Sequence, residues 1–167
     1  NEANATGWFD TITIYGPENL DNDFKVKFKN ILEQSRGGGY WIWKFYFIKQ
    51  KLNELNENDF LIYCDAGCTI NKQGKERYYE YLNMLNNSNY GIISFILSKY
   101  NNDLMDKYWT TKQLFDYFKI DMNSKIANSN QYCATVLIMK KNDHLLKIID
   151  HAFKLLEYDQ KLITDYY

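Results

Sequence analysis

Short runs of apolar and β-branched residues alternate with longer segments whose apolar residues recur at helical spacing, and this alternation limits the fold more than any other feature. The short runs predict strands at residues 9–15, 60–63, 90–97 and 131–139. The longer segments predict helices over residues 18–35, 40–55, 74–87, 111–119 and 143–156. Strands that alternate with helices favour an α/β domain in which helices flank a mainly parallel sheet.

Composition narrows the classes of function. The 167 residues are 46% hydrophobic, which predicts one domain over residues 1–167 with a substantial core. A formal net charge of −1 gives no overall field that would attract nucleic acid, so we expect no nucleic-acid partner. No apolar stretch approaches the roughly 20 residues of a membrane span.

The cysteines indicate a reducing compartment. Cys64, Cys68 and Cys133 are odd in number and irregularly spaced, which is not the pattern of a disulfide framework. Cys64 and Cys68 could suggest a metal site, but no second Cys or His pair completes it. We therefore expect a cytoplasmic protein.

Asp65 is the first candidate for chemistry, because it follows the apolar run at residues 60–63. The carboxyl ends of strands in open α/β sheets are where ligands bind. A carboxylate is a hard oxygen ligand suited to Mg²⁺ or Mn²⁺ beside a diphosphate, and the small Ala66 and Gly67 would let a nucleotide approach the backbone. The alternative is that Asp65 caps a turn.

The glycine-rich segment over residues 36–44 is the second candidate. Three glycines before a predicted helix offer N–H groups for a phosphate, and Arg36 and Lys44 add positive charge. Tyr40 and Trp43 could flank a ring. The spacing is not that of a P-loop or of a dinucleotide-binding fingerprint. The alternative is a glycine linker before a buried aromatic helix.

Weaker candidates lie further along the chain at Trp109, Gln131 and Asp165. The pattern alone favours a structural role for each of them. His144 and His151 share one predicted helix but lack the close spacing of a zinc site. No Ser-His-Asp or Cys-His arrangement can be identified.

Taken together, the motifs resemble those of a glycosyltransferase-like family found in bacterial polysaccharide clusters and large DNA viruses. That family typically has Gly-Tyr-Trp-x-Trp-Lys-Pro followed by Leu-x-Tyr-x-Asp-x-Gly-Cys, and this chain has similar residues at 39–44 and 59–68. Residues 109–112, 131–135 and 162–165 continue the resemblance in the same order.

The resemblance implies a GT-A fold, which is Rossmann-like, and a UDP- or GDP-sugar donor with Mn²⁺ or Mg²⁺. It places Asp65 at the metal and the donor. The other implied donor-binding residues are Arg36, Gly39, Tyr40, Trp43, Lys44, Ala66 and Gly67. Trp109 and Gln131 would lie on the side of a glycan or other hydroxyl acceptor. Asp165 is the candidate base if the reaction inverts the sugar configuration, and a retaining reaction needs no such base.

This sequence departs from the family pattern in three ways. Gly67 stands where an Asp-x-Asp motif has its second carboxylate, and Phe45 stands where the family has Pro. No strand is predicted before residue 9, where a GT-A domain begins with one, so we expect the domain to be incomplete at one or both ends.

Two other functions remain open at this point. A non-catalytic domain that binds a glycan or a protein would fit the single motif carboxylate. A nucleotidyltransferase can share an α/β scaffold, but its glycine-rich, basic nucleotide loop is not visible near the first strand.

Overall fold

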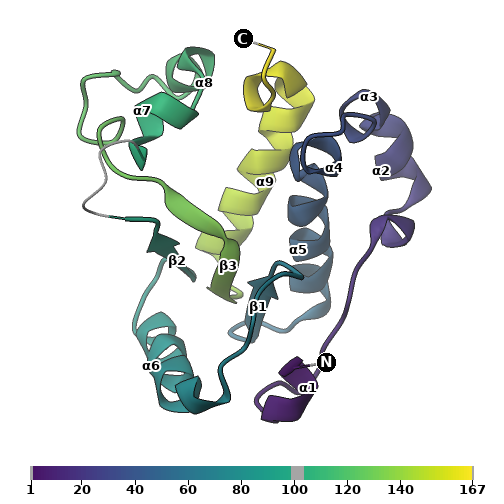
Figure 1. Ribbon diagram of the computed structural model, residues 1–167, viewed down its shortest axis with the longest axis vertical. Helices are drawn as coiled ribbons and strands as arrows, with labels where there is room; N and C mark the ends of the chain where they lie inside the picture. Colours follow the sequence, from purple (N-terminus) through teal and green to yellow (C-terminus); the bar gives the residue numbers. More distant parts are fainter. Residues whose placement is uncertain (1, 99–103, 167) are drawn as a thin grey trace. The chain divides into compact units, whose positions relative to one another are not determined.

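Residues 2–98 and 104–166 are described by the computed structural model of the chain, and Figure 1 shows its elements in sequence colours. Internal contacts divide the chain into two units. Unit 1 comprises Asn1–Ile93 and Thr135–Ile149, and unit 2 comprises Ser94–Ala134 and Asp150–Tyr167. That residues 1–167 act as one domain stays a prediction.

Within the described residues, one sheet forms from β1 (Phe60–Cys64), β2 (Ile92–Ile96) and β3 (Tyr132–Lys140), in the order β1-β3-β2. β3 runs antiparallel to β1, with Phe60 opposite Lys140. The N–H of Lys140 donates to the carbonyl of Gly91 and that of Leu97 to Gln131, each at 2.9 Å, so β2 is also antiparallel to β3. The prediction of a mainly parallel, GT-A-like sheet is therefore wrong.

The physical reason for this error is the position of β3. β1 and β2 follow one another in the chain with a helix between them, which is the pattern of a parallel crossover. In the structure β3 lies between the two and bonds to both. Periodicity shows where strands occur, but it does not show which strands are neighbours.

The strand predicted at residues 9–15 is also absent, since these residues have no strand structure. Their aromatic side chains pack on helices instead. Phe9 meets Tyr78 edge-on with ring centroids 5.6 Å apart, and Tyr15 stacks on Phe47 at 4.2 Å. The alternating pattern thus places rings on helix surfaces, where they gain contact area without a partner strand.

Three short helices, η1 (Pro17–Asn19), α2 (Asn22–Lys27) and α3 (Lys29–Leu32), take the place of the single helix predicted over residues 18–35. Asp21 begins the second of them by accepting the N–H of Phe24 at 2.6 Å, and Phe28 interrupts it with φ −111° and ψ 22°. The unit contains α1 (Glu2–Thr6), η1 (Pro17–Asn19), α2 (Asn22–Lys27), α3 (Lys29–Leu32), α4 (Gly37–Tyr40), α5 (Ile42–Glu54), η2 (Lys72–Gly74) and α6 (Lys75–Asn86).

Unit 2 contains α7 (Asp106–Trp109), α8 (Lys112–Tyr117) and η4 (Gln160–Ile163), and α9 (Asp143–Tyr158) contributes residues to both units. Thr111 caps α8 by accepting the N–H of Leu114 at 3.3 Å. The Thr111 hydroxyl also donates to the carbonyl of Leu162, so one side chain joins α8 to η4.

The element labelled α4 has a left-handed backbone. Gly37, Gly38, Gly39, Tyr40 and Trp41 all have positive φ, between 52° and 92°. Glycine adopts this conformation without strain, whereas Tyr40 and Trp41 each carry a cost of about 1–2 kcal/mol. The turn ends at Ile42, where the right-handed helix α5 begins.

The core of unit 1 forms around α5, which lies beside β1 (Figure 1). Ile42 and Leu52 of α5 have no exposed area. The buried hydrophobic residues of this unit are Leu20, Phe24, Phe28, Ile31, Ile42, Phe47, Ile48, Leu52, Leu85, Ile138, Met139, Leu145 and Ile149. α5 is therefore fixed rigidly enough to present a functional side chain.

The left-handed turn yields a prediction for stability. A Cβ at Gly39 would lie 2.7 Å from the Cα of Leu32 and 2.9 Å from the carbonyl oxygen of Ile31, at a φ of +92°. We expect Gly39→Ala to lower the free energy of unfolding by about 2–4 kcal/mol, from backbone strain and overpacking. Urea denaturation measures this.

Gly74→Ala is the matched control, because a Cβ there meets nothing within 4 Å and its φ is −80°. Its free energy of unfolding should stay close to that of the wild type. Equal stability of the two variants would show that the chain does not form the left-handed turn.

Candidate functional site

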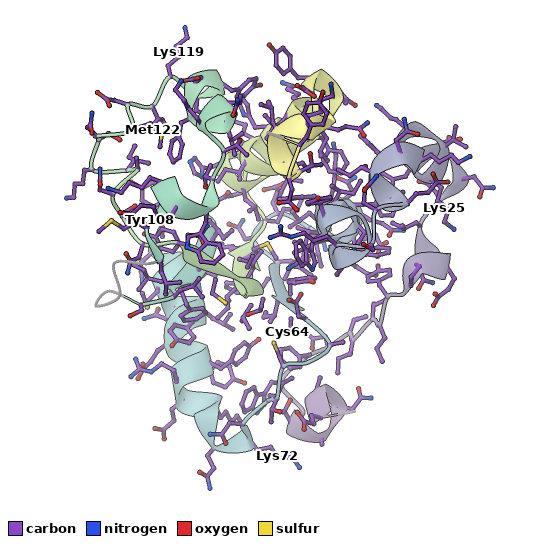
Figure 2. The ribbon with its side chains drawn as sticks, turned by 45° about the horizontal axis from the view of Figure 1, so that its top comes forward. Lys25, Cys64, Lys72, Tyr108, Lys119 and Met122 are labelled. Atoms are coloured by element: carbon purple, nitrogen blue, oxygen red, sulfur yellow. The ribbon has the colours of Figure 1, made fainter. Side chains whose placement is uncertain are left out.

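Asp65 lies on a tight turn at the carboxyl end of β1. Its N–H donates to the carbonyl of Thr135 at 2.8 Å, and its own carbonyl accepts the N–H of Cys68 at 2.9 Å. Figure 2 labels Cys64 at the point where the chain leaves β1. The backbone of Asp65 is thus held by the neighbouring strand, while the exposed Ala66 and Gly67 complete the turn.

Lys44 of α5 meets this carboxylate. Its ammonium Nζ lies 3.2 Å from Oδ1 of Asp65, and the exposed fractions of the two side chains are 9% and 29%. A buried ammonium is stable only with a counter-charge, which Asp65 supplies. The structure therefore brings together the leading charged residues of both predicted motifs.

Tyr63 completes the cluster and was not predicted as a site residue. Its hydroxyl donates to Oδ1 of Asp65, and its ring centroid lies 4.9 Å from Nζ of Lys44. Burial, and next the hydrogen bond to Asp65, raise the pKa of Tyr63 well above 10.0, so the hydroxyl stays protonated and can donate. Residues two apart on a strand share a face of the sheet. The spacing of Tyr63 from Asp65 was therefore the signal in the sequence that could have identified Tyr63 as a site residue.

The glycine-rich turn packs against its own chain. The ring of Trp41 covers Gly37, where a Cβ would come within 2.3 Å of it, and the indole N–H of Trp43 donates to the carbonyl of Gly37 at 3.0 Å. Gly39 is buried against Leu32. Packing alone therefore explains why Gly37 and Gly39 are glycines.

The other predicted donor-binding residues of this segment lie on or next to the turn. The guanidinium carbon of Arg36 lies 5.9 Å from the ring centroid of Tyr40. Arg36 is exposed, and Tyr40 and Trp43 are partly exposed. These three side chains remain accessible in part, whereas Gly39 does not.

The predicted acceptor residues Trp109 and Gln131 belong to unit 2. The Gln131 side chain hydrogen-bonds to Asp106, which begins the helical turn that ends at Trp109. The Trp109 side chain is 59% exposed. The structure thus joins Gln131 to α7 through Asp106, a residue that the sequence did not single out. Asp165 is an exposed residue of the same unit.

The thiols and carboxylates of the described residues form no metal cage. Residues 2–98 and 104–166 contain no group of three or more His, Cys, Asp or Glu side chains placed to hold a metal ion. Cys64 is exposed as a residue, but burial of its thiol raises the pKa to about 11, so the thiol is protonated at neutral pH.

A shallow hollow lies elsewhere in unit 1, beside the start of α9. It is lined by Glu57, Asn89, Asn142, Asp143, His144 and Lys147, none of which was predicted as a site residue. Asn142 caps the helix here by accepting the N–H of Leu145 at 2.8 Å. His144 contacts the carbonyl of Tyr90 through Nδ1 at 2.9 Å. The hollow is open, and Asn142 and His144 within it are engaged in structural hydrogen bonds, so the Lys44–Asp65 cluster is the better candidate.

No protein-family model, curated protein or solved structure matches the chain. Across residues 2–98 and 104–166, no helix combines the length and apolar character that crossing a membrane requires. The resemblance to glycosyltransferases therefore stays a hypothesis that depends on the motifs themselves.

Asp106 yields a prediction for unit 2. Burial raises the pKa of its carboxyl above 3.8, and the hydrogen bond from Gln131 opposes that rise. Because the folded pKa is raised, the charged form is disfavoured in the folded state and stability falls as pH increases through the folded pKa. We expect Asp106→Asn, which keeps an acceptor for Gln131, to be more stable than the wild type at pH 7.

Urea denaturation at pH 7 and pH 3 measures the free energy of unfolding of Asp106→Asn and of the wild type. The difference between the two proteins should shrink at pH 3, where the wild-type carboxyl is protonated. Asp116→Asn is a control in the same unit, because Asp116 is exposed and pairs with Lys112 at 2.6 Å. If Asp106→Asn were more stable than the wild type by the same amount at both pH values, the raised pKa of Asp106 would not be the cause.

Proposed function

We propose that the chain binds a nucleoside-diphosphate-sugar at the Lys44–Asp65 cluster and transfers the sugar to a hydroxyl group of a glycan or another acceptor. The observation that carries this proposal is the 3.2 Å contact between Lys44 and Asp65, which come from separate motifs of the resemblance. A diphosphate leaving group carries negative charge, and a preorganised cation stabilises it.

Asp65 also suits a divalent cation that arrives with the diphosphate. Mg²⁺ in such sites is held by one or two carboxylates together with phosphate oxygens. One carboxylate at the end of β1 fits that arrangement, and the described residues do not form the larger cage of a resident metal. When bound, such a cation would neutralise the departing diphosphate.

The transfer itself can be written in terms of bonds. The acceptor oxygen forms a bond to the anomeric carbon, and the bond from that carbon to the diphosphate oxygen breaks, with its electron pair leaving on the phosphate. The acceptor proton goes to a base, for which Asp165 is the candidate in an inverting reaction. A retaining reaction does not require that base.

A non-catalytic domain that binds a glycan or a protein is the second candidate. The observation that favours it is the engagement of Oδ1 of Asp65 by both Lys44 and Tyr63, as in a structural ion pair. This function predicts that no nucleotide-sugar is consumed, whereas the first predicts release of the nucleoside diphosphate.

The test is hydrolysis or transfer of UDP- and GDP-sugars with Mn²⁺, measured as release of UDP or GDP. We expect Asp65→Asn to reduce the rate by about 10²–10³-fold, the usual effect of losing one group that stabilises developing charge. Asn keeps the shape of Asp65 and accepts hydrogen bonds from Lys44 and Tyr63, but it removes the counter-charge of the buried Lys44 ammonium. We therefore expect Asp65→Asn to be less stable than the wild type, and its rate is measured under conditions in which circular dichroism shows it to be folded.

Asp59→Asn is the matched control, since Asp59 precedes the other end of β1 and accepts the N–H of Asn56 at 2.9 Å. It should leave the rate unchanged. Full activity of folded Asp65→Asn would refute the role of Asp65. Glycan binding by a wild-type protein that consumes no donor would favour the second candidate.

A further inference from the structure

The outer edge of β1 carries backbone groups without partners. β1 lies at one end of the sheet, with β3 on one side of it. The carbonyl of Asp59 and the N–H of Asp65, which flank the strand, both bond to β3. Bonding alternates along an antiparallel pair, so the N–H and C=O groups of Phe60, Ile62 and Cys64 point away from β3. Within the described residues these groups have no hydrogen-bond partner.

The sequence of β1 does not protect this edge. Phe60–Cys64 contains no charged residue and no Pro, two of the devices that usually keep an exposed edge from pairing. Pairing with a second copy is disfavoured, because an antiparallel pair centred on Ile62 would set Asp59 of one copy opposite Asp65 of the other. A strand from elsewhere in the same chain avoids that repulsion.

Residues 9–15, which we call the strap, have the pattern of a strand but no strand partner. β-branched residues occupy each position from 11 to 14, Thr-Ile-Thr-Ile, and favour an extended backbone. The strap makes no backbone hydrogen bond to another described residue. In Figure 1 and in Figure 2 the strap runs on the side of β1 that faces away from β3. It therefore lies on the side of the unpaired edge.

The faces of the strap and of β1 also agree. β1 turns Tyr63 toward α5, so Ile62 lies on the other face of the sheet. The strap turns Tyr15 toward the same helix, where it stacks on Phe47 at 4.2 Å. In an extended strap Ile14 therefore lies on the face of Ile62. Ile14 is 77% exposed, and addition of the strap to β1 would extend one apolar face and remove part of this side chain from water.

We propose that the strap closes onto the outer edge of β1 as a fourth strand, and that the structure shows its open form. Ring contacts tether the two ends of the strap to α6 and to α5, which lies beside β1, so closure orders only a short loop. Closure provides partners for the outward backbone groups of β1. Because β1 leads directly into Asp65, closure also steadies the strand that positions this carboxylate.

Amide hydrogen exchange followed by NMR tests closure, because β1 contains its own reference. The N–H groups of Leu61 and Tyr63 face β3 and should be protected whatever the strap does. The N–H groups of Ile62 and Cys64 face the unpaired edge. We expect these two amides to exchange about tenfold more slowly in the wild type than in a variant whose strap cannot pair.

The double variant Ile12→Pro with Thr13→Pro has such a strap. Successive strand residues point their N–H groups to opposite sides, so the two prolines remove a donor from the pairing side in either register. Ile12→Val with Thr13→Ser is the matched control, which keeps both N–H groups and should exchange like the wild type. Neither residue hydrogen-bonds to another described residue, so both variants should fold, and the Leu61 and Tyr63 amides report on this.

Ile62 and Cys64 amides that exchange equally fast in the wild type and in the double-proline variant would overturn the inference. Protection that rises with protein concentration would also overturn it, because a second copy would then cover β1. A further reading needs no variant: nuclear Overhauser effects should join backbone protons of the strap to those of β1, and their absence would overturn closure. Release of UDP or GDP tests the proposed function separately, so either proposal can fail without the other.

Discussion

The ion pair between Lys44 and Asp65 is the interaction on which the site depends. It joins the helix that forms the core of unit 1 to the turn that follows β1, at 3.2 Å and with little solvent around the ammonium. A charge buried to this extent needs its partner, so each residue fixes the position of the other. Tyr63 holds the carboxylate from the strand side and leaves its position well defined.

The left-handed turn before α5 sets where that helix begins, and hence where Lys44 lies. Its glycines relieve the strain of a positive φ and admit close neighbours, namely the Trp41 ring at Gly37 and the Leu32 backbone at Gly39. The indole of Trp43 closes the turn on Gly37. The glycine run therefore helps to place the start of α5, the helix from which Lys44 reaches Asp65.

The sequence was sufficient to locate elements with strong local signals, such as β1, α5 and α9, and to select Lys44 and Asp65. Strand order was not predictable, because β3 enters between β1 and β2 through contacts distant in sequence. The left-handed turn has no periodicity to reveal it. Tyr63 was missed because its spacing of two residues from Asp65 is a weak signal in an apolar strand, where an aromatic residue usually belongs to the core.

The central claim is that a diphosphate and its cation bind where Lys44 meets Asp65. The most direct measurement is the paramagnetic broadening of NMR signals of the chain by Mn²⁺ in the presence of UDP. The Ala66 methyl and the Tyr63 ring should broaden first, because they adjoin Asp65 in the turn and on β1. Broadening that spares these two residues and affects others would contradict the claim.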